Sequence, residues 1–285
     1  MRTVTNLSDL KTQIYLVDNG SLAPAATFQL RELASALGVL VQKKIKAVSL
    51  LHSHKISAEA LHGIPATIVK RQMRKDLAAG HRHFILLPLF LGPSRALSDY
   101  LPEVIKELKS EAGDFTAIIA DPLAGASVSE PDSRLAAMLS ERVQSADPDA
   151  TMQIALVDHG TPAPEVNTLR NSVAVQMSSF LARPVVAASM ERRDGPEFAF
   201  NEPLLENLDK LPEMNDGALL AAMFFLLPGR HAGDGGDVAQ IGEVLVKRRA
   251  FKEFARTALL GGHPVLLEIL ADRLEATANK LNKPC

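Results

Sequence analysis

The chain has 285 residues, which is enough for one large domain or for two of ordinary size. An apolar fraction of 47% with 22% charged residues provides for a buried core and argues against a disordered chain. The formal net charge of −2 leaves no basic excess for a nucleic-acid backbone or a membrane surface, so we expect neither partner.

Short apolar runs alternate with helical stretches through the first half of the chain. The opening residues, MRTVTNLSDLKTQ, lack the basic-then-apolar order of a signal peptide. The apolar runs are continuous rather than alternating, which is typical of parallel strands covered by helices on both faces. The predicted strands are Ile14–Asp18, Ala47–Leu51, Phe84–Phe90 and Thr116–Ala120, and the predicted helices are Ala25–Leu37, Asp99–Ala112 and Ser133–Gln144.

The second half follows the same order and ends in what looks like an added helix. Its longest apolar run, Ala218–Leu227, is too short to span a bilayer, so we expect a cytoplasmic protein. The single cysteine, Cys285, excludes an internal disulfide, a CxxC zinc site and a Cys-ligated iron–sulfur cluster. The predicted strands are Ile154–Asp158, Val185–Ser189 and Ala218–Leu227, and the predicted helices are Glu165–Leu181, Val238–Thr257 and Pro264–Leu281.

Two motifs occur twice in the same order. QIYLVDNGSLAP from Gln13 and QIALVDHGTPAP from Gln153 agree at 8 of 12 positions, at an offset of 140 residues. FLGPSRA from Phe90 and FLLPGRH from Phe225 share Phe, Leu, Pro and Arg, at an offset of 135 residues. Matches at nearly equal offsets indicate an internal duplication. We therefore predict two similar doubly wound α/β domains, 1–147 and 148–285, joined near the linker-like segment SADPDA. Because both copies lie in one chain, we expect a monomer whose two halves form an internal pseudo-dimer.

Two histidines follow strands of the second half. His159 comes directly after the first strand of that half, and His231 comes after the long strand. Ligand sites of open parallel sheets lie beyond the carboxyl ends of the strands, so the two imidazoles are expected at one rim. Imidazole binds first-row divalent metals and takes up protons near neutral pH; a surface-loop histidine is the alternative at each position. The first half has Asn19 and Ala96 at the matching positions, which indicates a single working half.

These motifs carry a resemblance to a known family. LVDHGTPAP together with FFLLPGRHAGDGGDV resembles the class II tetrapyrrole chelatases, the sirohydrochlorin cobaltochelatase and ferrochelatase family (CbiX/SirB type). The resemblance implies two flavodoxin-like α/β domains with a cleft between them. It also implies insertion of cobalt or iron into sirohydrochlorin or a related tetrapyrrole, in cobalamin or siroheme biosynthesis, with no cofactor beyond the substrate metal. The N-terminal half would be a degenerate copy.

The resemblance also implies roles for individual residues. His159 and His231 match the two family histidines that bind the incoming metal and help to remove pyrrole protons, and Glu191 matches the family glutamate. Thr161 replaces the usual serine and keeps its hydroxyl, and the segment Arg192–Pro203 looks like an insertion. Because the substrate edge carries acetate and propionate groups, we expect cationic and polar residues to bind it: Arg230, Arg95, Arg192, Arg193, Thr161 and Asn19.

Other readings remain open from the residues alone. A non-catalytic tetrapyrrole- or metal-binding relative would retain the cleft without turnover, and a flavodoxin-like metallohydrolase would need a nucleophile or carboxylate cluster that the motifs do not supply. His52 and His54 could form a second metal site, although polar loop histidines are the better interpretation. The glycine-rich stretch Gly233–Gly236 could hold an anion, but it lacks the order of a nucleotide-binding loop.

Overall fold

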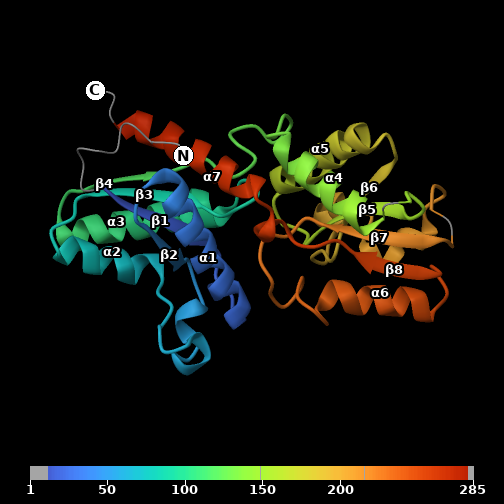
Figure 1. The fold of residues 1–285 in the computed structure, drawn as a ribbon, viewed down its shortest axis with the longest axis horizontal. Helices are drawn as coiled ribbons and strands as arrows, with labels where there is room; N and C mark the ends of the chain where they lie inside the picture. The colour runs from blue at the N-terminus through green and yellow to red at the C-terminus, as the bar shows by residue number, and fades with distance from the viewer. Residues whose placement is uncertain (1–11, 148, 215, 282–285) are drawn as a thin grey trace. The chain divides into compact units, whose positions relative to one another are not determined.

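A computed structural model describes residues 12–147, 149–214 and 216–281 of the chain (Figure 1). Within these residues the chain forms two compact units: unit 1 contains the described residues up to Gly125 and those from Pro264 on, and unit 2 contains those of Ala126–His263. Each unit is built on a four-stranded sheet in which all neighbouring strands are parallel. The opening segment without a signal-peptide pattern and Cys285 lie outside the described residues.

Unit 1 contains the first sheet, whose strands lie in the order β2-β1-β3-β4. Helices α1 and α7 pack together on one face of the sheet, and α2 and α3 pack together on the other (Figure 1). Both faces are therefore covered, which explains the continuous apolar runs. The strands are β1 (Gln13–Asp18), β2 (Ile45–Ser49), β3 (His83–Pro88) and β4 (Thr116–Ile119), and the helices are α1 (Pro24–Val41), α2 (Val69–Ala78), α3 (Leu101–Ala112) and α7 (Val265–Leu281).

Unit 2 contains the second sheet, in the equivalent order β6-β5-β7-β8. Helices α4 and α5 pack together, and α6 packs against β8 and a short 3-10 segment, Leu205–Lys210, that stands where α2 stands in unit 1. The strands are β5 (Gln153–Asp158), β6 (Val185–Ser189), β7 (Ala218–Met223) and β8 (Glu253–Arg256), and the helices are α4 (Arg134–Ala146), α5 (Pro164–Leu181) and α6 (Asp237–Lys247).

The two sheets have the same strand register. Gln13 pairs with Phe84 in the first sheet, and Gln153 pairs with Leu219 in the second. The paired residues differ by the two offsets that the repeated motifs gave, 140 for the first strand and 135 for the third. The predicted α/β fold class with two similar, duplicated domains is confirmed.

The last helix of each sequence half packs in the unit built by the other half. α4 follows β4 along the chain but packs against α5 and β7, whereas α7 follows β8 but packs against α1 and β3. α4 and α7 are thus equivalent helices, and the prediction that Pro264–Leu281 is an addition to the pattern was wrong. For the same reason the compact units do not coincide with the ranges 1–147 and 148–285, although the repeat divides there.

Two further elements differ from the sequence prediction. The expected helix Val238–Thr257 ends at Lys247, where Arg249 adopts a left-handed φ of 62° and the chain turns into strand β8. A four-residue edge strand has too few residues to show an alternating pattern, so the helical interpretation extended through it. The sequence prediction did not include helix α2, because this helix is highly charged and has only a narrow apolar stripe. The stripe is buried and includes Val69, Met73 and Leu77.

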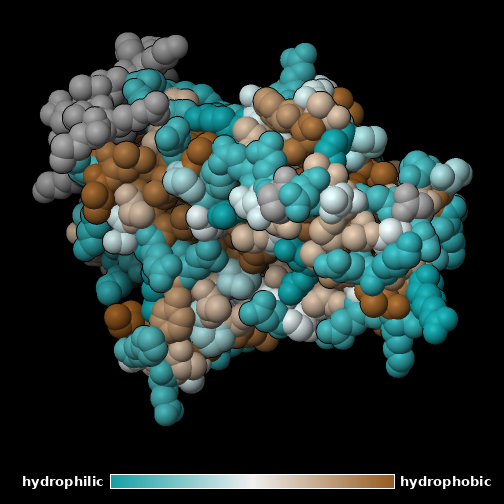
Figure 2. Space-filling view, turned by 45° about the vertical axis from the view of Figure 1, so that its right-hand side comes forward, coloured by the Kyte–Doolittle hydropathy of each residue, from teal (hydrophilic) through white to brown (hydrophobic). Residues whose placement is uncertain are grey.

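Polar and apolar residues are mixed on the face of the molecule that Figure 2 draws. Among residues 12–147, 149–214 and 216–281, no helix is both long and apolar enough to cross a membrane.

Candidate functional site

His159 and His231 lie side by side in unit 2. Their ring centroids are 4.4 Å apart and the ring planes meet at 67°. His159 directly follows β5, and His231 lies in the connection from β7 to α6. Because β5 and β7 are neighbouring parallel strands, their carboxyl ends open on the same edge of the sheet. The pairing of these strands therefore brings together two imidazoles that are distant in sequence.

Glu191 joins the two histidines because the loop after β6 passes very close to Gly160. The Nε2 atom of His159 is 3.3 Å from Oε1 of Glu191, and both side chains are about half exposed. The backbone N–H of Glu191 donates to the carbonyl of His159 at 3.2 Å. A Cβ atom on Gly160 would lie 1.9 Å from the Glu191 carbonyl oxygen, so the His-Gly motif needs its glycine for this approach.

In both rings, Nδ1 lies within hydrogen-bond distance of an oxygen atom. Nδ1 of His159 is 3.0 Å from the Gly160 carbonyl, and Nδ1 of His231 is 2.6 Å from Oδ2 of Asp237. Because these oxygens can only accept, a neutral ring that makes either contact as a hydrogen bond carries its proton on Nδ1 and a lone pair on Nε2. A histidine whose Nδ1 donates to a carboxylate or carbonyl oxygen is the usual form of a metal-binding histidine.

The glycine-rich stretch Gly233–Gly236 forms the turn that brings Asp237 back to His231. The backbone N–H groups of Asp237 and Val238 donate to the carbonyls of Arg230 and His231, at 3.3 and 3.2 Å. A Cβ on Gly236 would be 2.6 to 2.8 Å from these carbonyl oxygens. The first amides of α6 are thus used within the loop, so the stretch positions a carboxylate beside His231.

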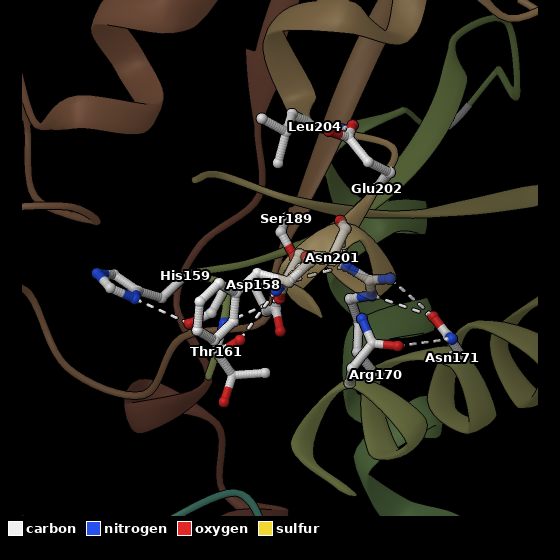
Figure 3. Close-up of polar contacts among 12 residues, drawn as sticks. Asp158, His159, Thr161, Arg170, Asn171, Ser189, Asn201, Glu202 and Leu204 are labelled. Atoms are coloured by element: carbon white, nitrogen blue, oxygen red, sulfur yellow. Dashed lines mark hydrogen bonds and ion pairs between the residues drawn. The ribbon is translucent and has the colours of Figure 1, made fainter. Parts of the chain in front are cut away.

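A buried polar cluster lies directly behind His159 (Figure 3). Its centre is Arg170 of α5, which is 1% exposed and has Nη1 3.7 Å from Oδ1 of Asp158. Burial raises the pKa of Asp158 and lowers the pKa of Arg170, while the opposite charge of each partner counteracts the shift. Figure 3 shows the His159 side chain directed away from Arg170, so the cluster supports the loop and does not reach the ring nitrogens.

The remaining predicted site residues of unit 2 have different partners. Thr161 Oγ1 accepts from the Ala163 N–H at 3.0 Å, so its hydroxyl holds the turn before α5. Arg192 donates to Oε1 of Glu202 at 2.8 Å and to two carbonyls of its own loop, and Arg193 lies over the ring of Phe198. Arg230 has a side chain that is 84% exposed, and its Nε lies 3.7 Å from Oδ2 of Asp237.

Unit 1 has no histidine at the positions that match His159 and His231, although its loop after β1 has the same form as the loop after β5. Asn19 follows β1 and is exposed, Ala96 begins a single π-helical turn before α3, and Arg95, also exposed, precedes it. Gly20 has a φ of 91°, and its added Cβ would meet the Leu51 carbonyl oxygen at 1.8 Å, as in unit 2. Leu51 therefore stands where unit 2 has Glu191.

A cavity of about 510 Å³ borders two of the acidic residues of the site. Glu191 and Asp237 line it together with Asp194, Glu202 and Glu206, and Arg192 is the cationic residue of the lining. Within the part of the chain that the structure describes, no group of three or more His, Cys, Asp or Glu side chains is arranged to hold a metal ion. His159 contacts His231 on one side and Glu191 on the other.

Sequence reasoning did not select two residues that hold this arrangement. Asp237 lies within the motif FFLLPGRHAGDGGDV, and its distance of six residues from His231 was the available signal. Arg170 lies on the buried side of α5, where the matching residue of α1 is Leu30. A charged residue among the buried positions of a helix was the signal for Arg170.

Comparisons with known proteins identify the fold. No protein-family model matches the sequence, and no curated protein matches it. SirB from Bacillus subtilis with Fe³⁺ superposes with a TM-score of 0.71 at 14% identity, over 95% of this chain and 97% of that chain. The sirohydrochlorin chelatase SirB from Bacillus subtilis subspecies spizizenii, in complex with cobalt, gives 0.68 at 13% identity, with coverage of 95% and 97%.

A third structure extends the same similarity. CbiX, described as the terminal enzyme for biosynthesis of siroheme in denitrifying bacteria, superposes with a TM-score of 0.58 at 16% identity, over 93% of this chain and 98% of that chain. The chain therefore has the fold of the CbiX/SirB-type chelatases, and the resemblance that the two motifs indicated is confirmed at the level of the fold.

Proposed function

We propose that this protein is a class II metal chelatase that inserts a divalent metal, cobalt or iron, into sirohydrochlorin or a related carboxylated tetrapyrrole. The observation that carries the proposal is the contact between His159 and His231, with a ring-centroid distance of 4.4 Å, at the carboxyl edge of a chelatase-like sheet. Each ring is held through Nδ1 and keeps Nε2 for an ion. Glu191 supplies a third donor at 3.3 Å from His159.

The chemistry of insertion needs a site that binds the metal without enclosing it. Two imidazoles and one carboxylate, with water completing the coordination shell, leave positions open for the macrocycle nitrogens. The reaction replaces two pyrrole N–H protons by one divalent ion. As the ion leaves Nε2 of each histidine, the freed lone pair becomes a proton acceptor, so the groups that deliver the metal also take up the protons.

The charges around the site suit both substrates. The carboxylates that line the cavity of about 510 Å³ beside Glu191 give a local negative potential that attracts a metal cation. The guanidinium of Arg230 lies 3.7 Å from Oδ2 of Asp237 but is 84% exposed, so it is accessible to an acetate or propionate group of the tetrapyrrole. Arg192 donates hydrogen bonds to Glu202 and to its own loop, so we propose that it stabilises this loop rather than binds the substrate.

One assay tests the proposal. Purified protein is mixed with sirohydrochlorin and either Co²⁺ or Fe²⁺, and the absorbance change of metal insertion is compared with the uncatalysed rate. We expect acceleration by the native chain and its loss in His159→Ala and His231→Ala. Both substitutions are at partly exposed loop positions, so thermal stability should stay within about 0.5 kcal/mol of the native value.

The alternative is a non-catalytic relative that binds a tetrapyrrole or a metal. It is favoured by the first half, where Asn19 and Ala96 replace both imidazoles. Tight binding of Co²⁺ or sirohydrochlorin without acceleration of insertion would establish this alternative in place of the chelatase. If the protein bound neither Co²⁺ nor sirohydrochlorin, both the chelatase proposal and the non-catalytic alternative would be wrong.

A further inference from the structure

Arg170 connects to the loops of His159 and Glu191, two of the three proposed metal ligands. Its Nη1 donates to Ser189 Oγ and to the Asn201 carbonyl, the latter at 3.2 Å, and its Nε and Nη2 donate to Oδ1 of Asn171 at 3.1 and 2.9 Å. Nη1 also lies 3.7 Å from Oδ1 of Asp158. Figure 3 shows the guanidinium group between the end of β6 and the first turns of α5.

The loop of His159 is fixed through these contacts. Oδ1 of Asp158 accepts from the Gly160 N–H at 3.1 Å and from Ser189 Oγ at 2.7 Å. The Asn201 side chain accepts from the N–H of Thr161 and donates to its carbonyl, both at 2.9 Å. The residues on both sides of the His-Gly step are therefore held to the cluster.

The loop of Glu191 is fixed at the same point. Ser189 is the last residue of β6, two positions before Glu191, and it is fully buried. Its hydroxyl accepts from Arg170 and donates to Asp158, so one side chain joins the two strand ends. The loops of His159 and Glu191 are thus both tied to one network with Arg170 at its centre.

The first half provides an internal comparison. It retains Asp18 and Ser49 at the positions of Asp158 and Ser189, but Leu30 stands at the position of Arg170. Leu30 is 2% exposed, so an apolar side chain fills this position of the same fold. Folding therefore does not require a buried arginine here, and a buried ion pair is by itself weak evidence for stability. The arginine occurs in the half that has the histidines.

We propose that Arg170 is a positioning residue: the fold brings the loops of His159 and Glu191 together, and Arg170 restrains them so that both side chains stay within reach of one metal ion. This inference rests on the proposed function, because the ion is the substrate metal. Arg170 itself stays buried and does not touch the ion or the macrocycle. Its role resembles that of outer residues that orient metal ligands, whose loss commonly changes metal affinity or activity 10- to 100-fold.

The test replaces Arg170 by the residue of the first half. In Arg170→Leu we expect the Kd for Co²⁺, measured by calorimetry, to rise roughly tenfold or more and kcat to fall, while KM for the tetrapyrrole stays unchanged. Arg170→Lys keeps the charge but lacks the planar fork, so it should recover part of the affinity. Native affinity in Arg170→Leu would overturn the proposal.

Arg183→Leu is the matched control. Arg183 precedes the amino end of β6 and donates to Asp147 Oδ2 at 3.1 Å and to the Met152 carbonyl, so its loss also breaks an ion pair of unit 2. We expect this variant to lose thermal stability while its Kd for Co²⁺ stays native. An equal loss of affinity in both variants would reduce Arg170 to a structural role and overturn the proposal.

Two further measurements keep the proposal testable. If Arg170→Leu does not fold, Ser189→Ala removes the bridging hydroxyl and leaves the charges; a native Kd in that variant overturns the positioning role. If the native chain binds no Co²⁺, the proposed function fails, and structures of the native and Arg170→Leu proteins then decide the positioning role. An unchanged His159–Glu191 separation of 3.3 Å would overturn it, and a larger one would support it.

Discussion

The α-carbon of Gly160 lies so close to the carbonyl oxygen of Glu191 that an added Cβ would stand 1.9 Å from it. Gly160 also has a φ of 93°, in the left-handed region that side chains rarely adopt. The same relationship recurs in unit 1, where an added Cβ on Gly20 would stand 1.8 Å from the Leu51 carbonyl oxygen. The close approach of the two loops is therefore a property of the repeated fold, and only in unit 2 does it bring a histidine to a glutamate.

The two glycines give a matched pair of variants. Gly160→Ala and Gly20→Ala should each destabilise the protein by about 2 kcal/mol, because each forces the neighbouring carbonyl to move and strains the left-handed residue. Metal affinity should fall in Gly160→Ala alone, since only that loop carries proposed ligands. Thermal denaturation and Co²⁺ calorimetry measure the two effects; lost affinity in Gly20→Ala would contradict the assignment of the site to unit 2.

Asp237 is expected to control the tautomer of His231. Asp237→Asn can present an N–H group to Nδ1, which would move the ring proton to Nε2 and block the proposed metal-binding nitrogen. We expect a roughly 10- to 100-fold higher Kd for Co²⁺ with little change in melting temperature. Asp209→Asn provides the control, because Asp209 pairs with Arg248 on the exposed side of the same unit. Native affinity in Asp237→Asn would contradict the proposed tautomer.

The chain should bind one substrate metal ion. Asn19 and Ala96 cannot supply a neutral imidazole, so we expect calorimetric titration with Co²⁺ to give one site that His159→Ala removes. His52 has a left-handed φ of 62°, and Nδ1 of His54 is buried without a hydrogen-bond partner among the described residues, so the His159→Ala variant also tests this pair as a site. Two equivalent sites, or one that survives in His159→Ala, would show that unit 1 carries the function.

The paired aspartates should respond oppositely to neutralisation. Burial raises the pKa of Asp18 to about 6, so stability is lost as the pH rises from about 4, near the unfolded value, through about 6. Asp18→Asn should stabilise the protein by up to about 3 kcal/mol at pH 8 and by nothing below pH 4. Burial also raises the pKa of Asp158, but Asp158→Asn should destabilise by roughly 3 kcal/mol, because leaving Arg170 buried without its carboxylate outweighs the relief of burying a charged carboxylate.

Denaturation curves from pH 4 to pH 8 measure both variants against the native chain. The pH range must stay within the reversible region so that free energies of unfolding are comparable. A stabilising effect of Asp18→Asn that is the same at pH 4 and pH 8 would contradict a raised pKa for Asp18. A stabilising effect of Asp158→Asn would contradict its pairing with Arg170.

The fold was predictable from sequence where local patterns repeat. Matching offsets of 140 and 135 residues implied equal strand registers, and both sheets have them. The strand β8 was not predictable, because Glu253–Arg256 is strand only through its pairing with β7. The exchange of α4 and α7 was also not predictable, since each is an ordinary amphipathic helix whose sequence does not specify which sheet it covers.

The amino-acid sequence by itself determined the duplicated α/β architecture, the strand ends at which we expect ligands, and the identity of the two histidines of the candidate site. It did so because buried strands and the glycine-dependent turns after them are local patterns that the chain contains twice. Only the tertiary structure decided that His159 meets His231 and Glu191, that Asp237 turns back to His231, and that Arg170 lies beneath them. Those relationships arise from the pairing of β5 with β6 and β7, and local sequence patterns do not specify distances between residues that separate strands bring together.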